Sequence, residues 1–477
     1  MKKLKGIFKT LMALIGVLLL ITLIFIGVDS YKTSYLNIKK NDLSKNDSYI
    51  IKNVNIIPMN QDTVLVDKMV YIKEGVVEKI SDSINVKGVQ IFDAANRYLT
   101  PGLIDMHVHV WDRYELGLYL SNGVTAVRNL WGMPMHLRIK EDVNTGNMIS
   151  PTFFTTGPKL TGHEFIGDDN LNLTSADEAK EKVISYKLRG FDLIKTYYGL
   201  DKEIFDAIIM QAKISDIDIV SHPSQKVPFS YHLNPQIKSI EHVEEIVQQP
   251  LNFKLDTIKL QSIADSLSRY KNVNYCPTLV GFNNIYQMMM NDSILESNSL
   301  NYMNPLIKFS DSEKQYERWF NAKNEDPNTI ERIKTQHNFH MKIVQKLHES
   351  GVNIICGTDA GIGITLPGFS IHEELRFYQK AGLSNYEVLK TATVNPSKTH
   401  NIMKSLGTIE EGKVANLLLV EKNPLMDLSS LENPIYVFVR GHKLNRETLD
   451  NYETIAKKRS NFIVSALLYL EYLIFEK

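Results

Sequence analysis

Short apolar runs alternate with amphipathic segments through the middle of the chain. Strand-like runs occur near residues 103–109, 122–128, 152–156, 191–197, 217–222, 238–243, 272–279 and 352–359. Helical patterns lie between them, for example at 175–189, 202–215 and 330–350. This order predicts parallel βα units in the α/β class. Together these units predict a (β/α)8 TIM-type barrel, with its active site at the C-terminal strand ends. An open doubly wound sheet is the alternative, but no glycine-rich phosphate loop follows any strand.

Shorter alternating runs at both ends of the chain predict a small β-domain. They fill residues 49–99, where Glu74-Gly75 makes a turn, and return at 415–420 and 436–441. We expect these pieces to pair into a β-sandwich. Its two parts would be 47–100 and 403–446, on either side of a barrel at 101–402.

The N-terminus predicts a membrane segment at residues 1–29. Four lysines precede an uncharged run at 10–28, which at about 1.5 Å per residue is nearly long enough to cross a bilayer. The sequence before Asp29 offers no good cleavage site, which favours an uncleaved transmembrane helix. The basic start then predicts a single-pass protein with the bulk of the chain, including the barrel, outside the cytoplasm. The alternative is a cleaved signal and a secreted or periplasmic protein. Residues 30–46 are polar and read as a stalk.

Two further segments are expected to lie outside the barrel. Residues 282–328 are polar and rich in Met and Asn, which indicates a lid over the barrel mouth or a disordered excursion. Residues 447–477 read as an apolar helical tail, too short at 462–475 to span a bilayer. The tail either lies along a membrane surface or covers an apolar patch on the barrel, and the sequence leaves both open.

The charge balance and the two cysteines exclude little, but they bear on nucleic-acid binding and on the core. The chain of 477 residues has 54 basic and 54 acidic residues and no basic stripe, which argues against a nucleic-acid partner. Cys276 and Cys356 each lie in an apolar, β-prone run, so we expect both to be small buried core residues.

Several potential metal ligands fall at the ends of the predicted strands. His107 and His109 are one residue apart on the first strand, so both imidazoles point to the same side. Lys195, His222, His242 and Asp359 end the fourth, fifth, sixth and eighth strands. A closed barrel would bring all of them into one funnel, which predicts a metal site. His163, just beyond the third strand, and Tyr197, which shares the strand parity of Lys195, are candidates for substrate binding.

The surrounding motifs resemble those of the amidohydrolase superfamily, in particular imidazolonepropionase-like and Xaa-Pro dipeptidase-like exported metal-dependent hydrolases. The resemblance covers about residues 50–441. It rests on Pro101-Gly102-Leu103-Ile104-Asp105, Gly123-Val124-Thr125-Ala126-Val127-Arg128, Gly357-Thr358-Asp359, Thr391-Ala392-Thr393-Val394-Asn395-Pro396 and Gly407-Thr408-Ile409-Glu410-Glu411-Gly412-Lys413.

The resemblance implies a binuclear site, usually with two zinc ions. His107 and His109 would hold one ion together with Asp359, His222 and His242 would hold the other, and a carbamylated Lys195 would bridge them. The two cations would generate a bridging hydroxide, with Asp359 as general acid and base and His242 as a second catalytic candidate.

The predicted function is a metal-dependent hydrolase of carbon–nitrogen bonds, an extracytoplasmic dipeptidase-like amidohydrolase. Its substrates would be small peptides, such as those ending in proline. A cyclic amide or imidazolone hydrolase is the alternative within the same chemistry. A non-catalytic, membrane-tethered binding protein on the same scaffold is an alternative of another class. Loss of a ligand would mark that class, and the sequence retains all of them. A homo-oligomer is compatible with the sequence.

Overall fold

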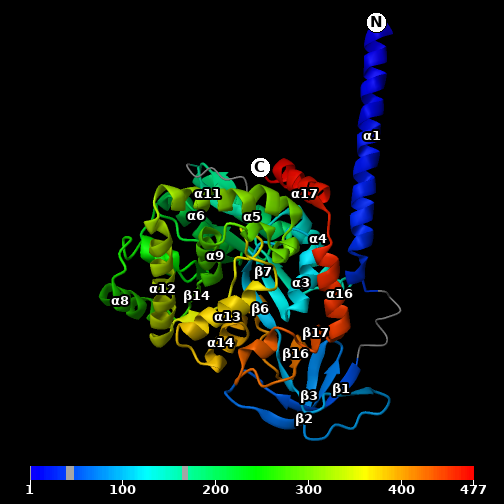
Figure 1. The fold of residues 1–477 in the computed structure, drawn as a ribbon, viewed down its shortest axis with the longest axis vertical. Helices are drawn as coiled ribbons and strands as arrows, with labels where there is room; N and C mark the ends of the chain where they lie inside the picture. The colour runs from blue at the N-terminus through cyan, green and yellow to red at the C-terminus, as the bar shows by residue number, and fades with distance from the viewer. Residues whose placement is uncertain (1, 39–47, 164–169) are drawn as a thin grey trace.

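The computed structural model describes residues 2–38, 48–163 and 170–477. Figure 1 shows a central barrel wrapped by helices, a β-sheet at one end of the body, and the long N-terminal helix α1 projecting from its side.

The predicted barrel is present and closed. Its strands are β6 (Leu103–Val108), β7 (Val124–Asn129), β8 (Thr152–Thr155), β11 (Leu193–Thr196), β12 (Asp218–Ser221), β13 (Ile237–Glu241), β14 (Asn274–Cys276) and β15 (Asn353–Ile354). Neighbouring strands pair in parallel from β6 to β8 and from β11 to β15. Parallel bridges between Thr156 and Leu193 and between Val108 and Ala360 join the two groups into a ring. Each predicted strand therefore corresponds to a barrel strand.

Two strands that the sequence pattern did not predict branch from the barrel. β9 (Lys159–Gly162) pairs with β11, and β10 (Asn170–Leu173) pairs with β9. They extend the sheet at the carboxyl end of β8 and carry Lys159 into the interior, where it is 6% exposed.

Amphipathic helices cover the barrel. They are α3 (Tyr114–Ser121), α4 (Pro134–Asn144), α5 (Ala176–Arg189), α6 (Lys202–Ile214), α7 (Glu244–Gln248), α8 (Thr257–Ser268), α9 (Leu279–Met290), α12 (Asn328–Glu349), α13 (Ser370–Lys380) and α14 (Asn385–Thr391). Their ends follow local capping chemistry. The Ser175 side chain accepts a hydrogen bond from the Glu178 amide at the start of α5, and Gly190 ends that helix with a φ of 95°. The helices predicted at 175–189, 202–215 and 330–350 are α5, α6 and α12.

The two ends of the chain form one β-domain, as predicted, but its strands are joined as a single sheet. It contains β1 (Ser48–Ile56), β2 (Leu65–Lys73), β3 (Val76–Ser81), β4 (Gln90–Asp93), β5 (Tyr98–Pro101), β16 (Leu417–Val420), β17 (Tyr436–Val439) and β18 (His442–Asn445). β5 pairs in parallel with β1 and antiparallel with β16, which links the early and late strands. The predicted sandwich of two sheets is corrected to this continuous sheet, which curls until Val76 also bridges to Val414.

Residues 282–328 are folded, and part of this segment borders the barrel mouth, as expected for a lid. After α9 the chain forms short turns and α10 (Pro305–Ile307), then a π-helical turn, η5 (Lys308–Ser312), and α11 (Glu313–Glu325). This part of the chain lines the same cavity as the predicted ligands.

The N-terminal helix α1 (Lys2–Lys32) is long and apolar enough to cross a membrane, and its apolar window is not buried in the body. The same length and composition also occur in N-terminal signal sequences. The predicted stalk is corrected in its first part, because α1 continues to Lys32 and Leu36 in η1 (Ser34–Leu36) is buried against the barrel core. The remainder of the predicted stalk, 39–46, lies outside the described residues.

The predicted C-terminal tail is helical. It forms α16 (Arg446–Lys457) and α17 (Phe462–Phe475). The inner side of α17 packs through Leu468, Tyr469 and Tyr472 against Trp111 and Trp131. One of the two expected roles is therefore present, since the tail covers an apolar patch on the barrel.

Candidate metal centre

The predicted ligands meet at the carboxyl ends of the barrel strands. They line one cavity of about 570 Å³, and they are His107, His109, Lys195, His222, His242 and Asp359. The ring centres of His107 and His242 are 4.7 Å apart, and those of His222 and His242 are 4.6 Å apart. Residues spread over most of the barrel sequence therefore converge, because every parallel strand ends at the same rim.

Asp359 lies close to both histidines of the first strand and to His242. Its Oδ1 atom lies 2.9 Å from His109 Nε2 and 3.2 Å from His107 Nε2. His107, His242 and Asp359 each offer a ligand atom, and these atoms lie within 4.8 Å of one another. With metal–ligand bonds of about 2 Å, this separation fits a shared cation.

Three buried nitrogen atoms of the predicted ligands have no hydrogen-bond partner among the described residues. They are Lys195 Nζ, His109 Nδ1 and His222 Nδ1. An unsatisfied buried polar group costs about 1–3 kcal/mol, so a cluster of them indicates a site that is completed by another group. Imidazole nitrogens and an amine that can carry a carboxylate fit a divalent cation of the zinc type.

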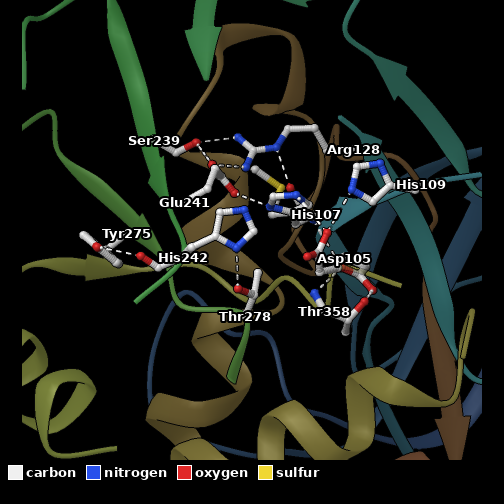
Figure 2. A network of polar contacts seen from close by, with 12 residues as sticks. Asp105, His107, His109, Arg128, Ser239, Glu241, His242, Tyr275, Thr278 and Thr358 are labelled. Carbon is white, nitrogen blue, oxygen red and sulfur yellow. Dashed lines mark hydrogen bonds and ion pairs between the residues drawn. The ribbon is translucent and has the colours of Figure 1, made fainter. Parts of the chain in front are cut away.

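Hydrogen bonds from outside the cavity fix the orientation of the imidazoles. His107 Nδ1 lies 2.8 Å from Glu241 Oε2, and His222 Nε2 lies 3.0 Å from Glu245 Oε1. A carboxylate only accepts, so each of these nitrogens carries the proton and the other ring nitrogen turns toward the cavity. A hydrogen bond between His242 Nδ1 and Thr278 Oγ1, 2.9 Å apart, also orients the ring of His242. Figure 2 shows the rings of His107 and His242 side by side, each tethered to a different strand end.

Burial sets the charge of the ligands. It lowers the pKa of His222 and His242 well below the usual histidine value, so both are neutral and able to ligate near neutral pH. Burial also lowers the pKa of Lys195 to about 8, so more of the amine is neutral near neutral pH than in an exposed lysine. Burial alone would raise the pKa of Asp359, but His107 and His109 outweigh it and hold that pKa well below its usual range.

The backbone is strained at the strand ends that carry these groups. His242 has a φ of 69° and Asp359 a φ of 61°, in the left-handed region that non-glycine residues rarely adopt. Strain of about 1–3 kcal/mol per residue is retained mainly at functional sites. Both side chains line the cavity. His242 directly follows β13, whereas Asp359 lies five residues beyond the end of β15.

Comparisons with known proteins agree with this architecture. Residues 274–444 match the model of the amidohydrolase family. The bottromycin amidohydrolase structure superimposes with a TM-score of 0.72 at 24% identity, over 90% of this chain and 95% of that one. A Xaa-Pro dipeptidase with bound methionine in the active site superimposes with a TM-score of 0.65 at 19% identity, over 83% of this chain and 100% of that one.

The match over residues 274–444 and the similarity of the fold support membership of the amidohydrolase superfamily.

A curated relative matches over a shorter stretch. Dihydroorotase of Carboxydothermus hydrogenoformans is 41% identical over 63 residues, which span 13% of this chain and 14% of the relative. The match covers too little of that protein for its activity to be transferred, so the substrate of this protein must be argued from its own site.

Sequence reasoning missed the buried ion pair beneath the candidate site. Arg128 Nη2 lies 2.8 Å from Glu241 Oε1, both side chains are fully buried, and Arg128 also donates to the Met106 carbonyl. Arg128 and His107 hold the pKa of Glu241 well below its usual range, although burial alone would raise it. The sequence did contain a sign of this pair. Arg128 and Glu241 are charged residues within predicted barrel strands, and Glu241 immediately precedes His242.

A second missed contact joins the first and last barrel strands. Thr358 donates from both its amide and its hydroxyl to the Asp105 carboxylate, at 3.1 and 2.7 Å. Asp105 is buried, which raises its pKa to about 7. This contact positions Asp359 relative to His107, because each is close in sequence to one of the two bonded residues.

The two candidates for substrate binding differ in their position. Tyr197 lines the cavity, with its ring centre 4.5 Å from that of His222. His163 is exposed in the turn after β9 and is not among the cavity-lining residues, so the structure does not bring it to the site. The added strand β9 turns Lys159 inward in its place.

Proposed function

We propose that this protein is a metal-dependent hydrolase of carbon–nitrogen bonds. The observation that carries the proposal is the convergence of the six predicted ligands around the unsatisfied Lys195 amine. In this proposal His107, His109 and Asp359 would hold one ion, His222 and His242 would hold a second, and Lys195 would bridge them if it were carbamylated. Two zinc ions suit this ligand set.

Cations held by these residues would supply Lewis acidity, which would activate a water molecule and stabilise negative charge on a carbonyl oxygen. Asp359 is ionised because His107 and His109 lower its pKa, so its carboxylate can accept the proton of the attacking water. It then returns that proton to the leaving nitrogen. His242, on the adjacent side of the cavity, is positioned to hydrogen-bond the carbonyl oxygen or to remain a ligand.

We infer that the substrate is a small peptide or a related amide with a free carboxylate. Lys159 supports this inference, because it is a buried cation in the cavity wall, with its Nζ 4.7 Å from the ring centre of Tyr197. A charged group at the end of a small cavity selects an oppositely charged end of a ligand. The fold similarity to a Xaa-Pro dipeptidase favours dipeptides with a restricted C-terminal residue as the first substrates to try.

A substrate screen tests this function. Zinc-loaded full-length protein should release amino acids from dipeptides, and dipeptide amides that lack the carboxylate should be poorer substrates. Lys159→Gln should raise KM for dipeptides by at least about tenfold, which corresponds to 1.4 kcal/mol of lost binding, and leave kcat nearly unchanged. If the protein hydrolyses cyclic amides but no dipeptides, it would instead be a cyclic amide hydrolase.

We further propose that α1 anchors the protein in a membrane with the catalytic domain outside the cytoplasm. The helix of 31 residues is about 46 Å long, which exceeds the hydrocarbon thickness of a bilayer. The purified protein should keep its N-terminal residues and sediment with membranes. A soluble form that begins after residue 28 would indicate a cleaved signal instead.

A further inference from the structure

The outward face of α17 is apolar, although this helix lies on the surface of the protein. Ile463, Leu470 and Ile474 follow one another along that face and are 44%, 49% and 65% exposed. Leu473 and Phe475 beside them are exposed as well. The solvent side of a surface helix normally carries polar residues. Since the inner side packs on Trp111 and Trp131, α17 is apolar on both sides.

The charged side chain within α17 is paired, and the pair is partly exposed. Glu471 is the charged residue of the helix, and its two carboxylate oxygens each accept a hydrogen bond of 2.8 Å from the Arg138 guanidinium on α4. This bidentate pair holds Glu471 against the body. The outward face is therefore an uncharged apolar surface about 21 Å long, too short to cross a bilayer and long enough to lie along one.

The apolar surface continues to the rim of the cavity. Phe309 is 60% exposed, and its ring centre lies 5.9 Å from that of Phe462. Ile307 and Ser310, on either side of Phe309 in the chain, line the cavity, as does Tyr469 of α17. We call this surface the α17 patch and define it as Phe309, Phe462, Ile463, Leu470, Leu473, Ile474 and Phe475.

The position of α1 indicates what covers the patch. Lys32, at the end of α1, donates a hydrogen bond of 3.3 Å to the hydroxyl of Ser460, two residues before α17. Tyr114 of α3 donates another, of 3.1 Å, to Asp29. These contacts fix the end of the candidate membrane helix beside the start of α17, and Figure 1 shows α1 passing alongside α17 as it leaves the body.

Charge at the start of α17 also suits a lipid surface. Lys32, Lys457 and Lys458 are exposed there. Basic residues beside an apolar helix face are typical of segments that lie at the interface of anionic membranes. The opposite end of the molecule, formed by the β-sheet of β1–β5 and β16–β18, points away from α1 and α17 (Figure 1).

We propose that the α17 patch rests on the surface of the lipid bilayer that α1 crosses, so that the cavity opens at the membrane–water interface. The occupant of the patch is lipid, and its contact is separate from the anchoring by α1. The proposal rests on α1 as a membrane span and does not require the hydrolase activity.

Site-specific lipid quenching tests the proposal on the full-length protein. Cys276 and Cys356 are fully buried, so a fluorophore can be directed to a new surface cysteine. Ile474→Cys places the label in the patch. Met426→Cys, 80% exposed between β16 and η7 (Leu428–Leu431), is the matched control. In liposomes of phosphatidylcholine and phosphatidylglycerol, doxyl-labelled lipid should quench the label at 474 at least about twofold more than the label at 426.

Flotation with the liposomes reports insertion of α1 independently. Equal, weak quenching at both positions in protein that floats would overturn the proposal and leave α1 as the anchor. Weak lipid quenching at 474 together with self-quenching between labels would overturn it in favour of a second copy of the chain. Protein that fails to float would overturn both the patch and the anchor.

A charged substitution gives a second readout. Leu470→Lys, combined with a label at Ile463→Cys, should reduce quenching by about twofold, because the ammonium resists transfer out of water. Far-UV circular dichroism should be unchanged, since Leu470 is half-exposed. Unaltered quenching with an intact fold would contradict the proposed contact.

Discussion

At the scale of single residues, the site is built from groups that are unstable unless something completes them. Lys195 is 1% exposed and its amine has no hydrogen-bond partner among the described residues. A cation or a covalent modification would satisfy it, whereas an empty pocket leaves a destabilising group in the core. Function and stability therefore make opposite demands at this position.

Lys195→Met is predicted to stabilise the metal-free protein while it abolishes metal binding. Removal of the unsatisfied amine should raise the free energy of unfolding by about 1–3 kcal/mol. Urea denaturation after chelation, together with elemental analysis after zinc loading, would measure the two effects. Lys140→Met is the control, because Lys140 donates to the Asp192 carboxylate at 2.6 Å and its loss should destabilise. A destabilised, zinc-binding Lys195→Met protein would contradict the proposed role.

Glu241→Gln is predicted to destabilise the protein by about 3–5 kcal/mol, the cost of leaving one member of a buried ion pair unpaired. Arg128 would keep its charge without a carboxylate, and His107 would lose its fixed orientation. Addition of Arg128→Met should recover part of the loss, which a double-mutant cycle by urea denaturation would measure. A single variant within about 0.5 kcal/mol of the parent would show that the pair is not coupled to folding.

At the scale of secondary-structure elements, the turn between β2 and β3 determines how closely the early strands of the β-domain pack against its late strands. Glu74 and Gly75 both have positive φ values, 49° and 78°, as the tight turn between β2 and β3 requires. The turn packs on the segment between β17 and β18. A Cβ atom on Gly75 would lie 2.8 Å from the Arg440 carbonyl oxygen.

Gly75→Ala is therefore predicted to cost more stability than Gly88→Ala. Both glycines have nearly the same φ, 78° and 77°, but a Cβ on Gly88 would meet nothing within 4 Å. The shared backbone cost of about 1 kcal/mol should appear in both variants, and the backbone clash only at Gly75. Urea denaturation of the two variants would compare them. Equal losses would mean that the neighbouring strand yields to the added methyl group.

At the scale of the whole molecule, the barrel and the cations are expected to stabilise each other. The ligands come from β6, β11 and the ends of β12, β13 and β15, so a metal pair would connect strands from opposite sides of the ring. Ligands that bind only the folded state stabilise it in proportion to their saturation.

Removal of metal by a chelator is predicted to abolish amide hydrolysis and to lower Tm. At a free zinc concentration of about 100 times Kd, the stabilisation should be about 2.7 kcal/mol. Differential scanning calorimetry and an activity assay, before and after zinc is restored, would measure both effects. Magnesium in place of zinc is the control, because it prefers oxygen ligands to the imidazoles of this site. Full activity at undetectable metal content would exclude the mechanism.

The sequence alone determined the barrel and the members of its site. Period-two apolar runs and the polar residues that end them located His107, His222, His242 and Asp359, because all parallel strands end at one rim. Local pattern also predicted the hairpin at Glu74-Gly75, the helices α5, α6 and α12, and the burial of Cys276 and Cys356.

Only the tertiary structure decided which groups stand behind the ligands and which face of each segment is covered. Arg128 and Glu241 lie on strands that are far apart in sequence, and nothing in their local context indicates that they meet. Lys159 enters the cavity, and His163 does not, because β9 adds to the sheet at β11. The apolar tail has no period that separates its two sides, so its partner on each side depended on the position of the barrel mouth and α1. Local pattern reflects burial and hydrogen bonding along one segment, whereas the choice of partner depends on contacts that form only when distant segments pack.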